Sequence, residues 1–131
     1  FSRATFTQGA YFSEATFTHA NFSGTTFTQG AYFSRATFTQ GAYFSEATFT
    51  ERTDFSGAIF HSEPSFTDVL GKARFSYKVI PEDYRFEVDP DSPCKIETEE
   101  QEYNGVKFMI PKGAILFDPD GSSEQKDDND S

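Results

Sequence analysis

The sequence predicts an all-β protein, a β-solenoid of about three coils whose open end is covered by a small C-terminal antiparallel β module. Three observations predict this fold. In the first half of the chain, the pattern Ala-x-Phe-Ser/Thr returns at alternating offsets of five and six residues. The residues between the Phe positions are mostly Ser, Thr and Gly, which are poor helix formers. In the second half the apolar period becomes two, which is typical of half-buried strands.

The repeat over residues 1–66 is expected to wind into coils. Phe residues five apart on a helix would point in widely different directions, so no single apolar stripe would form. In an extended segment, the Phe and the residue two before it share one face, and the Ser, Thr and Gly that follow suit a bend. Each unit is therefore one short side and one corner, and Phe should stack on Phe at about 4.8 Å from coil to coil. The expected inward residues are Phe6, Phe12, Phe17, Phe22, Phe27, Phe33, Phe38, Phe44, Phe49, Phe55, Phe60, Ala10, Ala15, Ala20, Ala31, Ala36, Ala42, Ala47 and Ala58.

Residues 36–40 (ATFTQ) and 15–19 (ATFTH) carry a resemblance to a known family. The pattern resembles the pentapeptide-repeat proteins, especially the Phe-centred variety, over residues 1 to about 66. The resemblance implies a right-handed, quadrilateral β-helix with Phe as the central inward residue and Ala as the second one. Two features depart from the family pattern. Only Asn21 and Asp54 supply the acidic or amide residue usual before the Phe, and every second unit is one residue longer, which predicts a coil of about 22 residues.

Three segments are expected: a solenoid over 1–71, a capping β module over 72–117 and an acidic disordered tail over 118–131. Alternating apolar residues predict strands at 73–79 and 84–88, interrupted by Pro81. The Asn-Gly pair at 104–105 predicts a hairpin with a type I′ turn, which would place Glu102 opposite Lys107. Residues 114–117 are expected to form a last strand.

The formal net charge of −10 belongs mostly to the second half of the chain. The single cysteine, Cys94, has no partner for a disulfide within the chain, which fits a reducing compartment. No apolar run is long enough to cross a bilayer. We therefore expect a cytoplasmic segment of a longer bacterial protein, with no membrane insertion by this segment.

The sequence predicts no enzyme, no cofactor and no metal site. His19 and His61 fall at outward repeat positions without metal-ligand partners at the right spacing. The Asp-Pro-Asp-Gly run at 118–121 lacks the later ligands of a calcium loop. The many Ser and Thr residues recur with the repeat, as a structural role requires. The leading hypothesis is a non-catalytic scaffold or protein-interaction module.

Tyr11, Tyr32 and Tyr43 are the candidate contact residues, because aromatic side chains are enriched at interfaces. On a coil of about 22 residues, Tyr11 and Tyr32 should share one face and Tyr43 should lie on another. The partner is expected to be an unidentified protein, with nucleic acid not expected and self-association through the solenoid ends or faces as a further option.

Two alternative functions remain at this stage. Some pentapeptide-repeat proteins bind DNA gyrase by mimicking DNA, which would require rows of carboxylates along the coils. Ice binding would instead use rows of outward Thr-x-Thr pairs split between two opposite faces. These pairs are Thr5/Thr7, Thr16/Thr18, Thr26/Thr28, Thr37/Thr39 and Thr48/Thr50.

Overall fold

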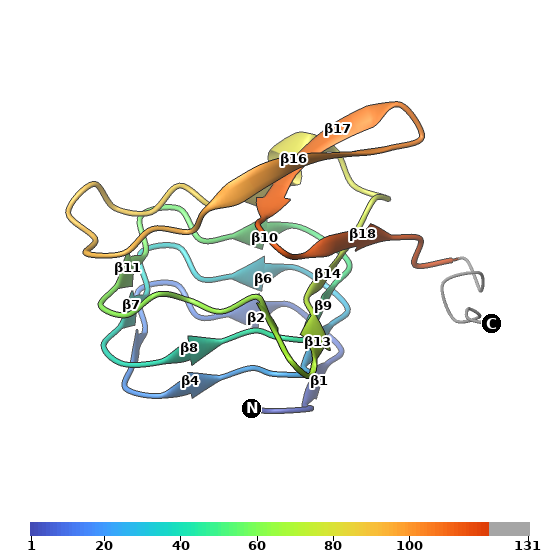
Figure 1. The fold of residues 1–131 in the computed structure, drawn as a ribbon. Helices are drawn as coiled ribbons and strands as arrows, with labels where there is room; N and C mark the ends of the chain where they lie inside the picture. Colours follow the sequence, from blue (N-terminus) through green and yellow to red (C-terminus); the bar gives the residue numbers. More distant parts are fainter. Residues whose placement is uncertain (121–131) are drawn as a thin grey trace.

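The computed structural model describes residues 1–120, which form a stack of β coils with a β hairpin lying across one end (Figure 1). The expected acidic tail falls outside the described residues from position 121 onward. The predicted all-β solenoid is confirmed. Its coils are here called coil 1 (residues 1–21), coil 2 (22–43) and coil 3 (44–66), after the stacked residues Phe1, Phe22, Phe44 and Phe66.

Each coil is built from strands of two residues, one on each side, and equivalent strands pair in parallel from coil to coil. Coil 1 holds β1 (Thr5–Phe6), β2 (Ala10–Tyr11), β3 (Thr16–Phe17) and β4 (Ala20–Asn21). Coil 2 holds β5 (Thr26–Phe27), β6 (Ala31–Tyr32), β7 (Thr37–Phe38) and β8 (Ala42–Tyr43). Coil 3 holds β9 (Thr48–Phe49), β10 (Thr53–Asp54) and β11 (Ile59–Phe60).

Four sheets result, and they enclose the core as four walls. Sheet A runs β1, β5, β9, and continues into the C-terminal strands β14 (Arg74–Ser76) and β18 (Ile115–Phe117). Sheet B runs β2, β6, β10 and continues into β15 (Tyr84–Arg85). Sheet C contains β3, β7 and β11, and sheet D contains β4 and β8. Sheets A and C form opposite walls, as do sheets B and D (Figure 1).

The step from coil to coil is close to the expected 22 residues but is not uniform. Phe6 pairs with Phe27, a step of 21, whereas Phe27 pairs with Phe49, a step of 22. The difference lies in the corner between sheets C and D. In coil 1 that corner contains only Thr18 and His19, and in coil 2 it contains the three residues 39–41. The corner absorbs the missing residue, so the rings on either side still stack.

The corners between sheets B and C and between sheets D and A follow Phe-Ser and have a left-handed residue at their third position. The positive φ angles belong to Arg3, Glu14, Gly24, Arg35, Glu46 and Gly57. In each corner the amide two residues after the Ser donates to the carbonyl of the Phe, as Ala36 N does to Phe33 O at 3.0 Å. A single positive φ at the third position is the mark of a type II turn. This left-handed conformation was not predicted from the sequence. It costs an L-residue about 1–2 kcal/mol.

The Phe rings form four columns along the solenoid axis. Within a column, ring centroids lie from 4.6 Å apart for Phe38 and Phe60 to 6.0 Å apart for Phe55 and Phe86. Rings of neighbouring columns often meet edge to face, as Phe22 and Phe33 do with an interplanar angle of 83°. Stacked and edge-on pairs are the favoured aromatic geometries, and each adds about 0.5–1.5 kcal/mol beyond the area that it buries.

The expected inward residues do point into this core, but their burial depends on the coil. The Phe residues from Phe22 to Phe60 have at most 1% of their surface exposed. Phe6, Phe12 and Phe17 are only half-buried, as is Ala15, because no coil covers them on the N-terminal side. Ala10, Ala20, Ala31, Ala36, Ala42, Ala47 and Ala58 are buried.

The C-terminal segment continues the solenoid before it caps it. A short antiparallel pair, β12 (Thr67–Asp68) and β13 (Gly71–Lys72), leads into β14, which pairs in parallel with β9. After the 3-10 turn η1 (Pro81–Asp83), β15 pairs in parallel with β10. Only antiparallel pairing was expected from the sequence in residues 72–117. The last strand, β18, is also parallel to its neighbour β14.

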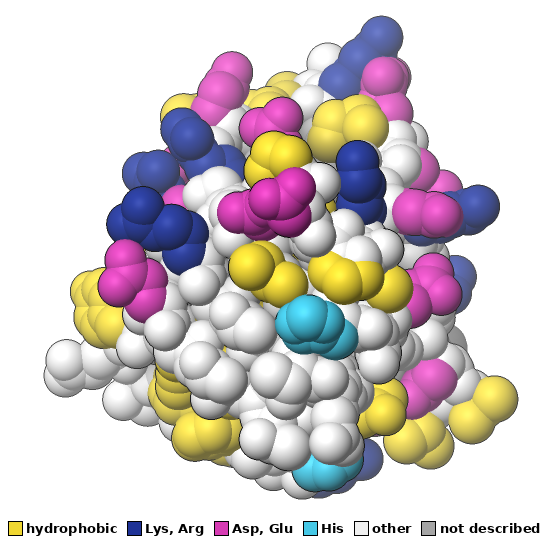
Figure 2. All heavy atoms as spheres, turned by 90° about the vertical axis from the view of Figure 1, so that its left-hand side faces the viewer, with side chains coloured by type: hydrophobic (Ala, Val, Ile, Leu, Met, Phe, Trp, Pro, Cys, Tyr) yellow, Lys and Arg dark blue, Asp and Glu magenta, His cyan; other side chains and the backbone are white. Residues whose placement is uncertain are grey.

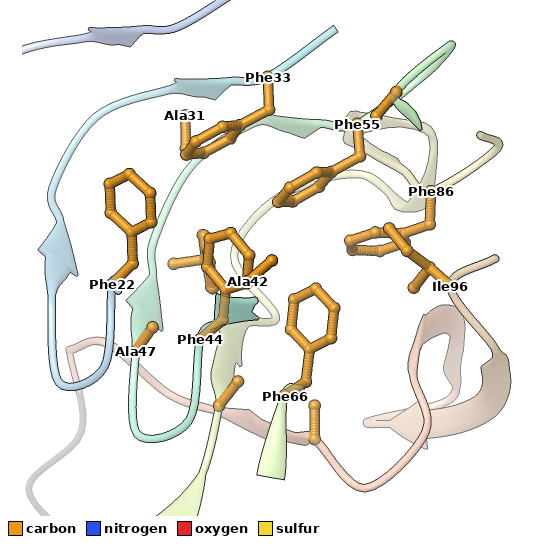
Figure 3. Packing of buried hydrophobic residues seen from close by; sticks show 14 of the residues in the cluster. Phe22, Ala31, Phe33, Ala42, Phe44, Ala47, Phe55, Phe66, Phe86 and Ile96 are labelled. Carbon is orange, nitrogen blue, oxygen red and sulfur yellow. The ribbon is translucent and has the colours of Figure 1, made fainter. Parts of the chain in front are cut away.

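The antiparallel cap itself is the hairpin of β16 (Thr98–Tyr103) and β17 (Val106–Pro111). The predicted type I′ turn is confirmed, because Asn104 and Gly105 have φ angles of 53° and 83°. Glu102 lies opposite Lys107, as predicted. The inner face of the hairpin buries Phe108 and Ile110, with 1% and 0% of their surfaces exposed. The hairpin and Ile96 together close the C-terminal end of the ring columns (Figure 3).

Candidate functional site

A row of paired side chains runs along the outside of sheet B. Tyr11 is paired with Tyr32, Tyr32 with Asp54, and Asp54 with Arg85. The two Tyr rings are stacked, with centroids 5.1 Å apart and planes 5° apart. Tyr11 has 76% of its surface exposed. The wall thus presents two aromatic rings with their hydroxyls, followed by one carboxylate and one guanidinium.

Each outward Tyr lies over a glycine two residues before it. A Cβ added at Gly30 would be 2.3 Å from the hydroxyl oxygen of Tyr32, and one at Gly41 would be equally close to that of Tyr43. The same relation holds for Gly9 and Tyr11, at 2.5 Å. The Gly-Ala-Tyr triplet therefore folds each ring flat against the corner. Where the chain has no Gly at this position, it has no Tyr either, as the triplets at 19–21 and 52–54 show.

The three candidate contact tyrosines do not share one surface. Tyr43 lies on sheet D, paired with Asn21, on the wall opposite to Tyr11 and Tyr32 (Figure 1). A single flat partner could therefore contact the pair or Tyr43, but not all three.

The two residues that match the family pattern at this position bind their own corners. The side-chain oxygen of Asn21 accepts a hydrogen bond from Ser23 N at 3.0 Å. That of Asp54 accepts from Ser56 N at 2.8 Å and from Ser56 Oγ at 2.6 Å. Asn and Asp side chains commonly bond to the backbone two residues later in this way. A Tyr at the equivalent position gives up this bond and exposes a ring.

The Thr pairs lie on sheets A and C, with the first Thr of each pair on a strand and the second at the corner that follows it. In three pairs the second hydroxyl donates to a carbonyl of the preceding coil. Thr28 Oγ1 bonds Phe6 O at 2.6 Å, Thr39 bonds Phe17 O at 3.1 Å, and Thr50 bonds Phe27 O at 2.8 Å. These hydroxyls hold the coils together at the corners. Thr7, Thr18 and Thr39 are nevertheless exposed, so exposure does not separate the two Thr residues of a pair.

Four of the eight Lys, Arg, Asp and Glu side chains in the coils lie at left-handed corners, where they form two ion pairs. Arg35 Nη2 lies 3.0 Å from Glu14 Oε2, on the corner between sheets B and C. Arg3 Nη2 lies 3.6 Å from Glu46 Oε1, on the corner between sheets D and A, and its side chain passes over Gly24. Figure 2 shows a coil surface with few charged side chains, whereas most charges lie over the C-terminal part. Within the described residues, the coils offer no continuous row of carboxylates of the kind that DNA mimicry requires.

Two hollows flank the cap on either side of Ile96. The first has a volume of about 570 Å³ and is lined by Tyr84, Phe86, Ile96 and Met109, with Glu82, Arg85 and Glu87 among its polar residues. The second, about 510 Å³, lies between residues 63–67, 95–97 and 111–113. The Tyr84 hydroxyl donates to Ser76 O, and burial raises the pKa of this hydroxyl well above its usual value. Tyr84 is therefore part of the core.

The remaining reactive side chains do not converge. His19 and His61 are exposed on different coils, and Cys94 is half-buried in a β-bridge to Phe60. Among residues 1–120, no three His, Cys, Asp or Glu side chains are grouped in a way that could hold a metal ion. Tyr77 and Lys78 instead fasten the end of the described chain. Tyr77 stacks on Tyr103 with ring centroids 4.1 Å apart, and the hydrogen bond that Lys78 donates to Asp120 raises the pKa of Lys78.

A comparison with protein families agrees with this architecture. A family model described as pentapeptide repeats (9 copies) matches residues 1–37 and 24–70, which together make up more than half of the chain. No match was found among curated proteins or among solved structures. Over the part of the chain that the structure describes, no helix has the length and apolarity needed to cross a membrane.

Proposed function

Since the chain belongs to the pentapeptide-repeat family, we propose that it is a non-catalytic scaffold that presents an ordered flat wall to another protein. The proposal rests on one observation, namely which parts of each repeat face inward and which face outward. The ring columns and the coil-to-coil hydrogen bonds lie inside the stack. In the described residues, the outward side chains repeat without grouping into a metal site. A rigid wall suits binding because little conformational freedom is lost when a partner docks.

The wall of sheet B is the best candidate for the contact surface. Tyr11 and Tyr32 form a stacked pair that packing against Gly9 and Gly30 holds in place. Rigid aromatic rings supply a large contact area at low entropic cost, which is why they dominate many interfaces. Asp54 and Arg85 extend the row with one charge of each sign, so the surface can also fix the orientation of a partner.

The chain supplies its own neutral replacements for a test. Asp54 occupies the position of Tyr32 one coil further along sheet B, and Asn21 occupies the position of Tyr43 on sheet D. The double variant Tyr11→Asn, Tyr32→Asn should therefore fold normally, because each new side-chain oxygen can accept a bond from the corner, as that of Asn21 does, and no charge is added next to Asp54. Tyr43→Asn is the matched control on the opposite wall.

The experiment is affinity capture from the cells that produce the protein, with the wild type and both variants immobilised at equal density. The expected result is a protein that the wild type and Tyr43→Asn retain and that the double variant loses. Circular dichroism and urea unfolding should show all three chains equally folded. Retention that is the same for all three chains, or no specific retention by the wild type, would contradict the proposal.

A further inference from the structure

Sheet B extends past coil 3 by one strand, β15, and the far edge of that strand has unpaired backbone groups. The carbonyl of Arg85 accepts a hydrogen bond from Phe55 N at 2.8 Å, so this group faces coil 3. Backbone groups alternate along a strand, so Tyr84 C=O and Phe86 N–H face away from coil 3. Within residues 1–120, β15 pairs only with β10, and neither of these two groups has a hydrogen-bond partner. An edge of this kind readily pairs with another strand.

The hollow of about 570 Å³ described above lies against this edge. Tyr84 and Phe86 line it together with Ile96 and Met109, and its volume falls in the range of ligand pockets. Met109 has 48% of its surface exposed. A Met side chain is unbranched and flexible, so it adapts to the shape of an occupant. Every residue that lines the hollow falls between positions 56 and 109. The fold therefore leaves room for an extended segment beside β15.

The charges that line the hollow alternate along this edge. Arg85 lies at its middle, Glu82 lies before β15 and Glu87 lies after it, and all three side chains are exposed. In the part of the chain that the structure describes, none of the three belongs to an ion pair. Opposite charges on neighbouring strands attract, and like charges repel. A strand added to this edge should therefore be positive, negative and positive along its outer face.

We propose that this hollow binds an extended segment of another protein, which joins sheet B as its next parallel strand and has the pattern basic, apolar, acidic, apolar, basic. All pairs within sheet B are parallel. The acidic residue lies beside Arg85, donates its N–H to Tyr84 C=O and accepts at its own C=O from Phe86 N–H. The basic residues lie toward Glu82 and Glu87, and the apolar side chains point into the hollow. Strand addition is a recurring mode of peptide recognition.

This site goes beyond the proposed function, because the stacked tyrosine pair takes no part in it and either proposal can fail alone. The test is calorimetric titration of the 131-residue chain at low ionic strength with the acetylated and amidated peptide Lys-Val-Glu-Val-Lys. One peptide should bind per chain. Lys-Val-Lys-Val-Lys should bind about fivefold more weakly, since its central charge repels Arg85. Glu-Val-Lys-Val-Glu, with all three charges reversed, should bind more weakly still. The net charge of −10 would by itself favour the most basic peptide, so the expected order identifies local recognition.

A charge reversal on the protein should exchange the preferred peptide. Glu87→Lys should weaken binding of Lys-Val-Glu-Val-Lys by about fivefold and strengthen binding of Lys-Val-Glu-Val-Glu by about the same factor. The variant should fold, because Glu87 is exposed and only its backbone carbonyl bonds to coil 3. Glu63→Lys is the matched control, since it makes the same change in charge beside the other hollow. It should leave the order of the peptides unchanged.

The backbone bonds are tested separately from the charges. N-methylation of the Glu in Lys-Val-Glu-Val-Lys removes the N–H that bonds Tyr84 C=O and should weaken binding by about tenfold. N-methylation of the second Val, whose N–H faces away from β15, should leave the affinity unchanged. In the complex, the amide of Phe86 should exchange its hydrogen more slowly. The amide of Phe55 is already bonded to Arg85 and should not change.

Four outcomes would overturn the proposal. They are an absence of binding up to the solubility limit of the peptide, tighter binding of Lys-Val-Lys-Val-Lys, equal effects of the two N-methyl groups, and equal effects of Glu87→Lys and Glu63→Lys. Protection of the Phe86 amide together with the expected order of peptides would establish strand addition at β15.

Discussion

Coil 1 and coil 3 are built from the same repeat, yet within residues 1–120 only coil 3 is covered by C-terminal strands and a hairpin. At the C-terminal end, sheets A and B gain the extra strands β14 and β15, and Phe86, Ile96, Phe108 and Ile110 cover the rings. At the N-terminal end, all four sheets stop at coil 1 and Phe1 is largely exposed. A repeat array buries its core only where a neighbour covers it, so terminal units need a different sequence. Residues 67–117 provide that sequence at the C-terminal end.

One ring column contains both a covered ring and a partly exposed ring, so the two can be compared directly. Phe12, Phe33, Phe55 and Phe86 stack in sequence, and Phe55 is completely buried whereas Phe12 is half-buried. Phe55→Ala should lower the free energy of unfolding by about 3–5 kcal/mol, because it leaves a cavity between covered rings. Phe12→Ala should lower it by about 1–2 kcal/mol, because less apolar surface is lost.

Urea unfolding of the two variants, measured on monomeric protein, checks this difference. Equal losses for the two variants would mean that coil 1 is as well covered as coil 3, and the contrast between the ends would disappear.

The cap can be weakened without touching the repeat. Ile110 is fully buried on the inner face of β17, and Ile110→Ala should reduce the free energy of unfolding by about 3 kcal/mol. Val106→Ala at the hairpin tip is the control and should change it by less than about 0.5 kcal/mol, since Val106 is exposed. Hydrogen exchange should show the loss first at Phe55 N and Gly57 N, which donate to the segment under the hairpin. Faster exchange confined to coil 1 would be incompatible with a capping role.

A smaller loss of stability is expected at two left-handed glycine corners, one in coil 3 and one in coil 2. Gly57→Ala would place a Cβ 2.9 Å from Arg35 Cγ, and Gly24→Ala would place one 3.2 Å from Arg3 Cγ. Both substitutions place an Ala at a positive φ, which destabilises the fold by about 1 kcal/mol. The loss should be larger for Gly57→Ala, because Arg35 is pinned between coils by Glu14, whereas Arg3 can move toward solvent at the open end.

Gly105→Ala supplies the reference for these two variants. Its φ is also positive, at 83°, but no atom lies within 4 Å of the added Cβ, so it isolates the backbone cost. Thermal unfolding of the three variants should rank the losses as Gly57, then Gly24, then Gly105. A reversed order would show that crowding by the Arg side chains does not matter.

The ring columns could be predicted from the sequence because Phe returns every five or six residues along the repeat. The left-handed corners were missed, although Gly24 and Gly57 held the signal. Gly alternating with Arg and Glu at one repeat position indicates a positive φ. The parallel pairing of β14, β15 and β18 could not be predicted, since these strands have only two or three residues and no longer follow the period.

The tyrosine wall was partly predictable from the sequence. The period placed Tyr11 and Tyr32 on one face and Tyr43 on another, as observed. What the period could not give was the packing of each ring on the glycine before it, because that contact depends on side-chain direction. The ion pairs between corners, such as Arg3 with Glu46, were also beyond the sequence, since they span residues two coils apart.

The unequal length of the corner between sheets C and D shows where this fold tolerates insertions and deletions. Phe17 stacks on Phe38 and Phe22 on Phe44 even though one corner has two residues and the next has three. Near the cap, Phe49 still stacks on Phe75 although β12 and β13 have been inserted between sheets D and A. Small deletions and whole hairpins are thus accommodated at the bends without disturbing the aromatic interior. The bends are therefore the natural places at which a protein engineer could graft a foreign loop onto this scaffold.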